Sequence, residues 1–96
     1  MPMTVIVTRD VPQRTRGFLA SVMPEPAPGV YTSGELSKGV RERIWVVMTD
    51  WHAATGEGSI VMVWRDDKAS GGLGIASLGT PPRQLTNLDG VLVSVW

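Results

Sequence analysis

Apolar runs and amphipathic stretches alternate along the chain, and this pattern predicts a mixture of strands and helices. Val5, Ile6 and Val7 are contiguous and β-branched, which is typical of a strand over residues 4–8 that is covered on both faces. Such a strand belongs in the middle of a sheet. Residues 59–64 form a second near-continuous apolar run. Further strands are predicted over residues 30–33, 73–78 and, after the Asp89-Gly90 turn, 91–96, with a loop over 79–84.

Two stretches carry apolar residues at helical spacing. The first covers about residues 11–22 and contains Pro12, which suits a first helical turn because it lacks an N–H group. The second begins after Ser37, a good N-cap residue, and ends at Gly56. The predicted apolar stripes are Val11, Thr15, Phe18, Leu19 and Val22 in the first helix, and Val40, Ile44, Val47, Met48 and Trp51 in the second.

The order of these elements predicts an α+β fold. Between the helices, Pro24, Pro26 and Pro28 permit at best an edge strand before the strand at 30–33. The chain is therefore expected to form one ferredoxin-like βαββαβ domain over residues 1–96, with an additional C-terminal strand. Both helices would cover one face of the sheet. Since the two main strands lack a polar side, we expect a homodimer packed sheet against sheet.

Composition excludes several classes of protein. The 96 residues suffice for one domain, and nine basic residues balance nine acidic ones, which argues against binding through bulk charge. The absence of cysteine excludes disulfides, thiolate catalysis and cysteine zinc sites. The apolar runs are too short for a membrane span or a secretory signal. We therefore expect a cytoplasmic protein with no membrane partner.

Acidic residues offer limited catalytic chemistry. Asp10 follows the first strand, and two interpretations are open: it caps the first helix, or it holds a catalytic Mg²⁺ together with its copy across a dimer axis. Asp66 and Asp67 follow a strand and are more typical of a solvated turn. The single histidine, His52, suits the C-terminal dipole of the second helix better than the role of a base. With no second histidine, a zinc site is disfavoured.

Basic residues indicate a nucleic-acid surface. Arg14 and Arg16 stand at a predicted helix start, where the dipole and free N–H groups favour phosphate. Lys38 and Arg41, predicted to lie off the apolar stripe, would extend this surface. Arg43 and Arg83 are further candidates. Contacts of this kind would be made to the backbone and would carry no sequence preference. Spacing alone leaves it equally open that these are solvated charges.

The C-terminal stretch is apolar and β-prone, so its exposed edge should be covered. We interpret residues 85–96 as a partner-docking segment, with the alternative that the strand completes its own sheet. The candidate docking residues are Val91, Leu92, Val93, Val95 and Trp96.

A family resemblance rests on five stretches in this order: VTRDVP, RTRGFLA, GVYTSGELSKGVRERIW, SIVMVW and LDG. Together they cover essentially the whole chain and resemble the small CRISPR-associated adaptation protein (Cas-two) in its type I-E branch. The resemblance implies a ferredoxin-like homodimer at the centre of the spacer-acquisition complex. There it would hold double-stranded prespacer DNA between two dimers of the integrase subunit (Cas-one), on which its C-terminal strand docks. The wider family is described as metal-dependent endonucleases, whereas this branch is usually assigned a scaffolding role.

The resemblance extends to individual residues. Arg14 and Arg16 match the arginine pair of the family. Relatives carry a glutamate where this chain has Arg9, and the acid here comes one position later, which reverses the side-chain direction along a strand. Pro82 replaces the first of two arginines in a loop, and Arg83 retains the second.

Three hypotheses follow. The chain is a non-catalytic DNA-binding scaffold of CRISPR adaptation, a Mg²⁺-dependent endonuclease using Asp10 from both protomers, or a dimeric regulatory module that binds a small ligand. The arginine placement and the apolar terminal strand favour the first hypothesis over the third.

Overall fold

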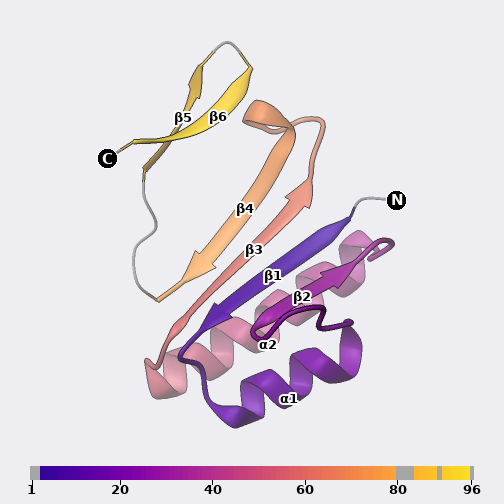
Figure 1. Cartoon of the computed structure of the whole chain (residues 1–96), viewed down its shortest axis with the longest axis vertical. Coiled ribbons are helices and arrows are strands. Elements are labelled where there is room, and N and C mark those ends of the chain that lie inside the picture. Colours follow the sequence, from indigo (N-terminus) through magenta and orange to yellow (C-terminus); the bar gives the residue numbers. More distant parts are fainter. Residues whose placement is uncertain (1–2, 80–83, 89, 96) are drawn as a thin grey trace.

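A four-stranded antiparallel sheet with two helices forms the body of the protein (Figure 1). The computed structural model describes residues 3–79, 84–88 and 90–95. The elements are β1 (Thr4–Arg9), α1 (Gln13–Val22), β2 (Val30–Ser33), α2 (Lys38–Thr55), β3 (Ser59–Arg65), the short 3₁₀ helix η1 (Ser70–Gly72), β4 (Leu73–Leu78), β5 (Gln84–Leu88) and β6 (Val91–Val95).

The strand order is β2-β1-β3-β4, so β1 lies between two neighbours as its apolar sequence predicted. Val7 pairs with Val30 on one side and with Val61 on the other. β3 in turn pairs with β4, which is the far edge of the sheet.

The proline-rich segment before β2 acts as an incomplete edge strand. The N–H groups of Val30 and Thr32 donate to the carbonyl oxygens of Ala27 and Pro24, each at 2.9 Å. Proline has no N–H group to return, so pairing stays partial, as predicted. With this segment counted as a strand, the chain through β3 follows the βαββαβ order. The fold is thus compatible with the ferredoxin-like prediction, with β4 added at the opposite edge.

Helix α1 begins two residues later than predicted. Its N-cap is Pro12, and no side chain caps it. The prediction that Asp10 caps this helix is wrong: Asp10 adopts a left-handed backbone conformation (φ 55°) and is separated from Gln13 by the extended Pro12. Asp is among the residues that tolerate this conformation in a turn. At the other end Val22 is 43% exposed, contrary to the predicted stripe, and Met23 is buried instead.

Helix α2 has the predicted boundaries. The Ser37 hydroxyl accepts a hydrogen bond from the Val40 N–H at 3.2 Å. Gly56 ends the helix in the left-handed conformation that glycine adopts without strain, and its N–H donates to the His52 carbonyl oxygen. Along the stripe Ile44 and Met48 are buried, but Val40 is 41% exposed. At the first turn of the helix the next residue, Arg41, is buried instead.

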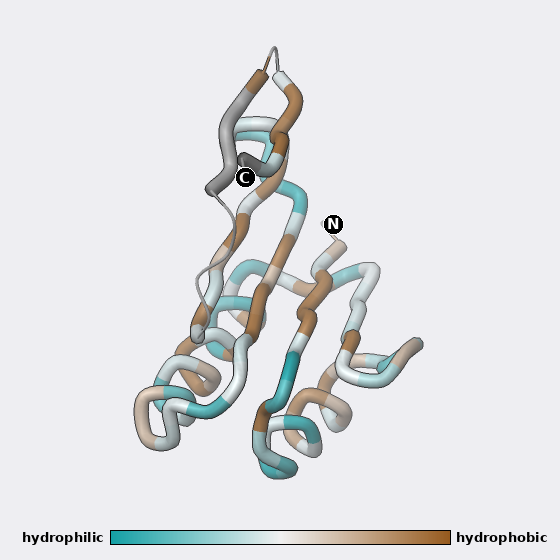
Figure 2. The backbone as a smooth tube through the Cα atoms, turned by 60° about the vertical axis from the view of Figure 1, so that its left-hand side comes forward, coloured by the Kyte–Doolittle hydropathy of each residue, from teal (hydrophilic) through white to brown (hydrophobic). Residues whose placement is uncertain are grey.

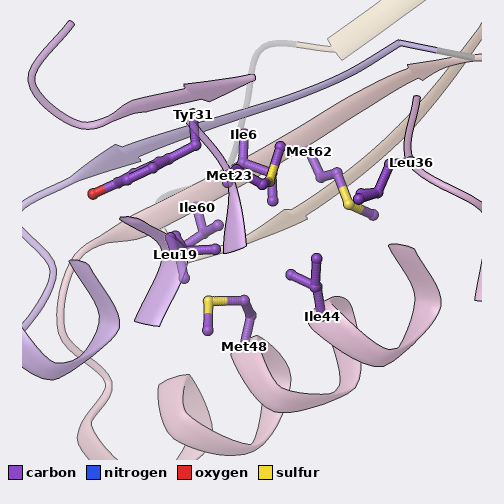
Figure 3. Close-up of a cluster of buried hydrophobic side chains, with 9 residues drawn as sticks. All are labelled: Ile6, Leu19, Met23, Tyr31, Leu36, Ile44, Met48, Ile60 and Met62. Atoms are coloured by element: carbon purple, nitrogen blue, oxygen red, sulfur yellow. The ribbon is translucent and has the colours of Figure 1, made fainter. Parts of the chain in front are cut away.

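The core lies between the helices and one face of the sheet (Figure 3). Side chains alternate along a strand, and the alternate residues that include Ile6 and Met62 point to the helices. Both helices therefore cover the same face. The buried apolar residues are Ile6, Leu19, Met23, Tyr31, Leu36, Ile44, Met48, Ile60 and Met62.

The opposite face of the sheet, here called the helix-free face, is also apolar. Figure 2 shows the hydrophobic runs of the strands and the change to hydrophilic residues at the end of β1. Val7, Leu73 and Ile75 are exposed on this face at 43%, 40% and 36%. The prediction that the main strands are apolar on both sides is confirmed. Further apolar residues of the face are Met3, Val5, Val61 and Val63, and the polar Arg65 and Ser77 lie beside them.

The C-terminal residues form a separate hairpin of β5 and β6 beside η1 (Figure 1). β5 was not predicted, although Asp-Gly between two β-prone runs is a strong hairpin signal. Leu88 pairs with Val91 across the turn, and the Leu92 side chain packs against Gly71. In the described part of the chain, no helix is long and apolar enough to cross a membrane.

Candidate nucleic-acid interface

The N-terminus of α1 lies at the end of the sheet where β1 finishes (Figure 1). Its first turn contains no acidic residue and has no side-chain cap. No acidic side chain of the first turn offsets the positive end of the helix dipole, and Arg14 and Arg16 are both exposed there. This arrangement suits a phosphate group.

Arg14 is held against an aromatic residue of the other helix. Its guanidinium carbon lies 3.9 Å from the centroid of the Trp51 ring. Trp51 is half-buried and makes an edge contact with Phe18, with ring centroids 5.4 Å apart. Sequence analysis assigned Trp51 only to an apolar stripe. Helical periodicity cannot show that the end of α2 meets the start of α1.

Arg16 borders a second aromatic residue. The hydroxyl of the buried Tyr31 donates to the carbonyl oxygen of Arg16 at 3.5 Å, a long hydrogen bond. Burial raises the pKa of Tyr31, the charge of Glu25 acts in the same direction, and Arg16 opposes both. Tyr31 is therefore a neutral donor at physiological pH. Glu25 itself accepts a hydrogen bond from the Gly29 N–H at 2.9 Å.

Lys38 and Arg41 lie at the other end of the helix layer, because α2 begins where α1 finishes. Lys38 is exposed and sits 4.0 Å from the Glu42 carboxylate, a surface pair of little energetic weight. Within one protomer the structure does not bring Lys38 together with Arg14 and Arg16. Arg43 is exposed on α2, and Arg83 lies outside the described residues.

Arg41 does not lie off the apolar stripe as predicted. It is only 8% exposed, and its guanidinium lies 4.6 Å from the ring centroid of Trp64. The Trp64 ring can lie here because Gly74, its neighbour on β4, has no side chain. A long aliphatic stem with a planar end packs well on an indole, which explains the burial of a charged residue. Arg41 is therefore left out of the interface that we propose.

The acidic candidates are far apart. Arg9 pairs with Ser59, whereas Thr4 pairs with Trp64, so Asp10 and Asp66 lie beyond opposite ends of these paired strands. Six residues of strand separate those ends by about 20 Å. Within residues 3–79, 84–88 and 90–95, no three acidic or histidine side chains gather into a metal site. Asp10 therefore stands apart from the Asp66–Asp67 pair within one protomer.

Asp66 and Asp67 serve the turn after β3. Asp66 accepts a hydrogen bond from the Lys68 N–H at 3.0 Å, and Asp67 accepts one from the Arg65 side chain at 3.1 Å. Local contacts of this type are typical of turn residues. The solvated-turn interpretation of the pair is thus supported.

His52 lies in the last turn of α2, as expected of a partner for the helix dipole. Its Nε2–H donates to the Gly58 carbonyl oxygen at 3.1 Å. This contact ties the helix to the loop that enters β3. This hydrogen bond gives His52 a structural role at the same end of the sheet as the first turn of α1, which contains Arg14.

The hairpin exposes apolar side chains. Leu88 and Val91, which pair across the turn, are 58% and 60% exposed. Leu92 and Val93 are half-buried. The Val95 side chain and Trp96, two of the predicted docking residues, lie outside the described part of the structure.

The sequence matches the model of one protein family. Residues 3–93 align with the family described as CRISPR-associated protein (Cas_Cas2CT1978). The match spans both helices, the whole four-stranded sheet and most of the terminal hairpin.

Proposed function

Since the chain belongs to this family of CRISPR-associated proteins, we propose that it is a dimeric scaffold of spacer acquisition in the cytoplasm. It holds double-stranded prespacer DNA and bridges integrase subunits, without catalysing a reaction itself. The observation that carries the DNA-binding part is the uncapped N-terminus of α1 with two exposed arginines. Backbone contacts from such a site tolerate any sequence, as capture of foreign DNA requires.

The helix-free face supports the dimer. A contiguous apolar sheet surface is unfavourable in water, and an identical surface on a second copy covers it symmetrically. A two-fold dimer also doubles the number of arginines available to one duplex. The hairpin supports integrase docking in the same way, through the exposed pair Leu88 and Val91.

The DNA-binding proposal is tested by replacing both arginines of α1. Arg14→Ala combined with Arg16→Ala should weaken binding to a random-sequence duplex and flatten its salt dependence. Two arginines in each of two protomers contact about four phosphates, and each contributes about 0.9 to the slope of log K against log salt. Fluorescence anisotropy with a labelled duplex measures this slope.

The control is Lys68→Ala, which removes an exposed lysine from the turn after β3, at the other end of the sheet. It should leave the salt slope unchanged. Sequence preference should also stay unchanged in the double variant. An unaltered slope after loss of Arg14 and Arg16 would place the DNA elsewhere on the protein.

The competing endonuclease hypothesis depends on Asp10. Asp10→Asn keeps the size of the side chain and its tolerance of the left-handed conformation but removes the charge that Mg²⁺ needs. We expect spacer acquisition to continue, because Arg9 stands where relatives carry an acid, which leaves a metal site at Asp10 short of ligands. New spacers are counted in cells that carry the variant. If the variant stops spacer acquisition while the complex with the integrase still assembles, the endonuclease hypothesis replaces the scaffold proposal.

A further inference from the structure

The Arg14 guanidinium lies over an indole ring at an exposed helix start. An arginine in such a position ordinarily samples many rotamers, and ordering it on binding costs conformational entropy. Here the Trp51 ring lies 3.9 Å from the guanidinium carbon, and Trp51 is itself fixed by half-burial and by the edge of Phe18. The three side chains come from both helices. The contact therefore restricts Arg14 before any ligand arrives.

We propose that Trp51 is a positioning residue for DNA, which holds the Arg14 guanidinium so that its N–H edge faces a backbone phosphate at the start of α1. This inference rests on the proposed function. A ring at this distance occupies one side of the guanidinium, and N–H groups directed away from the ring stay free to bind phosphate oxygens. A pre-positioned arginine binds more tightly because less freedom is lost.

Arg16 provides an internal contrast. The aromatic residue beside it, Tyr31, is engaged through its hydroxyl group, which meets the Arg16 carbonyl oxygen and side chain, and not through its ring face. Of the two arginines, only Arg14 is stacked on an aromatic ring. If Trp51 acts by positioning Arg14, its effect on DNA binding disappears when Arg14 is absent.

A double-mutant cycle tests this dependence. Trp51→Leu keeps an apolar side chain but removes the aromatic face, and Trp51→Phe keeps an aromatic face. With the full-length chain and a labelled random-sequence duplex at low salt, Trp51→Leu should weaken binding about two- to fivefold, the factor expected of an exposed cation–π contact. Trp51→Phe should retain most of the affinity. In an Arg14→Ala background, Trp51→Leu should have no further effect.

Two further measurements sharpen the test. Trp45→Leu makes the same change at a half-buried tryptophan of α2 near Arg41 and should not alter DNA binding. NMR should show upfield ring-current shifts of the Arg14 side-chain protons that vanish in Trp51→Leu. This readout reports the stack without DNA.

The outcomes separate the inference from the function on which it rests. Equal weakening by Trp51→Leu with and without Arg14 would mean a general structural role and overturn the inference alone. The same holds if Arg14→Ala weakens binding but Trp51→Leu does not. If neither arginine affects duplex binding, the proposed function fails as well. If the unmodified chain lacks the ring-current shifts, Arg14 does not lie on Trp51 in solution and the inference is wrong.

Discussion

Val7→Lys is expected to convert the proposed dimer into a monomer. Val7 lies on the helix-free face beside Val30 and Val61 and is 43% exposed in the single chain. In a sheet-to-sheet dimer two lysines would be buried without partners, and each buried charge costs several kcal/mol. The dissociation constant should rise at least about a thousandfold, because every 1.4 kcal/mol is about a factor of ten. Sedimentation or light scattering at micromolar concentration measures the change.

Val22→Lys is the matched control. Val22 has the same exposed fraction, 43%, but lies at the end of α1, on the helical side of the sheet. A lysine there is also favourable for the helix dipole, so folding and dimerisation should persist. A dimer that survives Val7→Lys would use another surface. An unmodified chain that is monomeric at these concentrations would remove the dimer from the proposal altogether.

Loss of the last strand is expected to abolish spacer acquisition. Deletion of residues 91–96 removes β6 and with it one half of the exposed apolar pair of the hairpin. The four-stranded sheet and both helices remain, since the hairpin is a separate sheet that lies beside η1. DNA contacts of the dimer should therefore persist while the integrase no longer binds. Co-purification with the integrase and spacer counting in cells measure the two effects.

A point substitution avoids the unpaired β5 that the deletion leaves. Val91→Glu places a charge on the exposed pair, and Ser94→Glu places the same charge at an exposed position on the other face of β6. Only Val91→Glu should release the integrase. If both variants bind the integrase and support acquisition, docking does not use this face of the hairpin.

The local pattern of the sequence determined most of the fold. Contiguous β-branched residues predicted the central strand β1, and Ser37 and Gly56 marked the ends of α2. Helix caps and apolar residues on both faces of a strand leave direct traces in residue type. The proline-rich edge was predictable for the same reason: an edge strand is where a missing N–H costs least. The separate hairpin was missed, although Asp89-Gly90 carried the signal for it.

The sequence also placed Arg14 and Arg16 in the first turns of one helix. Residues two apart in a helix point to different sides, and the fold accordingly sets Arg14 beside Trp51 and Arg16 beside Tyr31. The sequence could not place them relative to Lys38, because that relation depends on the antiparallel packing of α1 on α2. Only the folded chain shows that these cations lie at opposite ends of the helix layer.

Three residues show where tertiary structure decided the outcome. Asp10 does not cap the helix, because α1 starts only at Gln13. The left-handed conformation of Asp10 and the extended Pro12 in the connecting turn determine this start. Arg41 is buried on Trp64 rather than exposed, because β3 and β4 bring an indole and a glycine under the first turn of α2. Trp51 meets Arg14 because two helices distant in sequence cross one sheet face side by side. Periodicity describes one element at a time, and each of these contacts joins two.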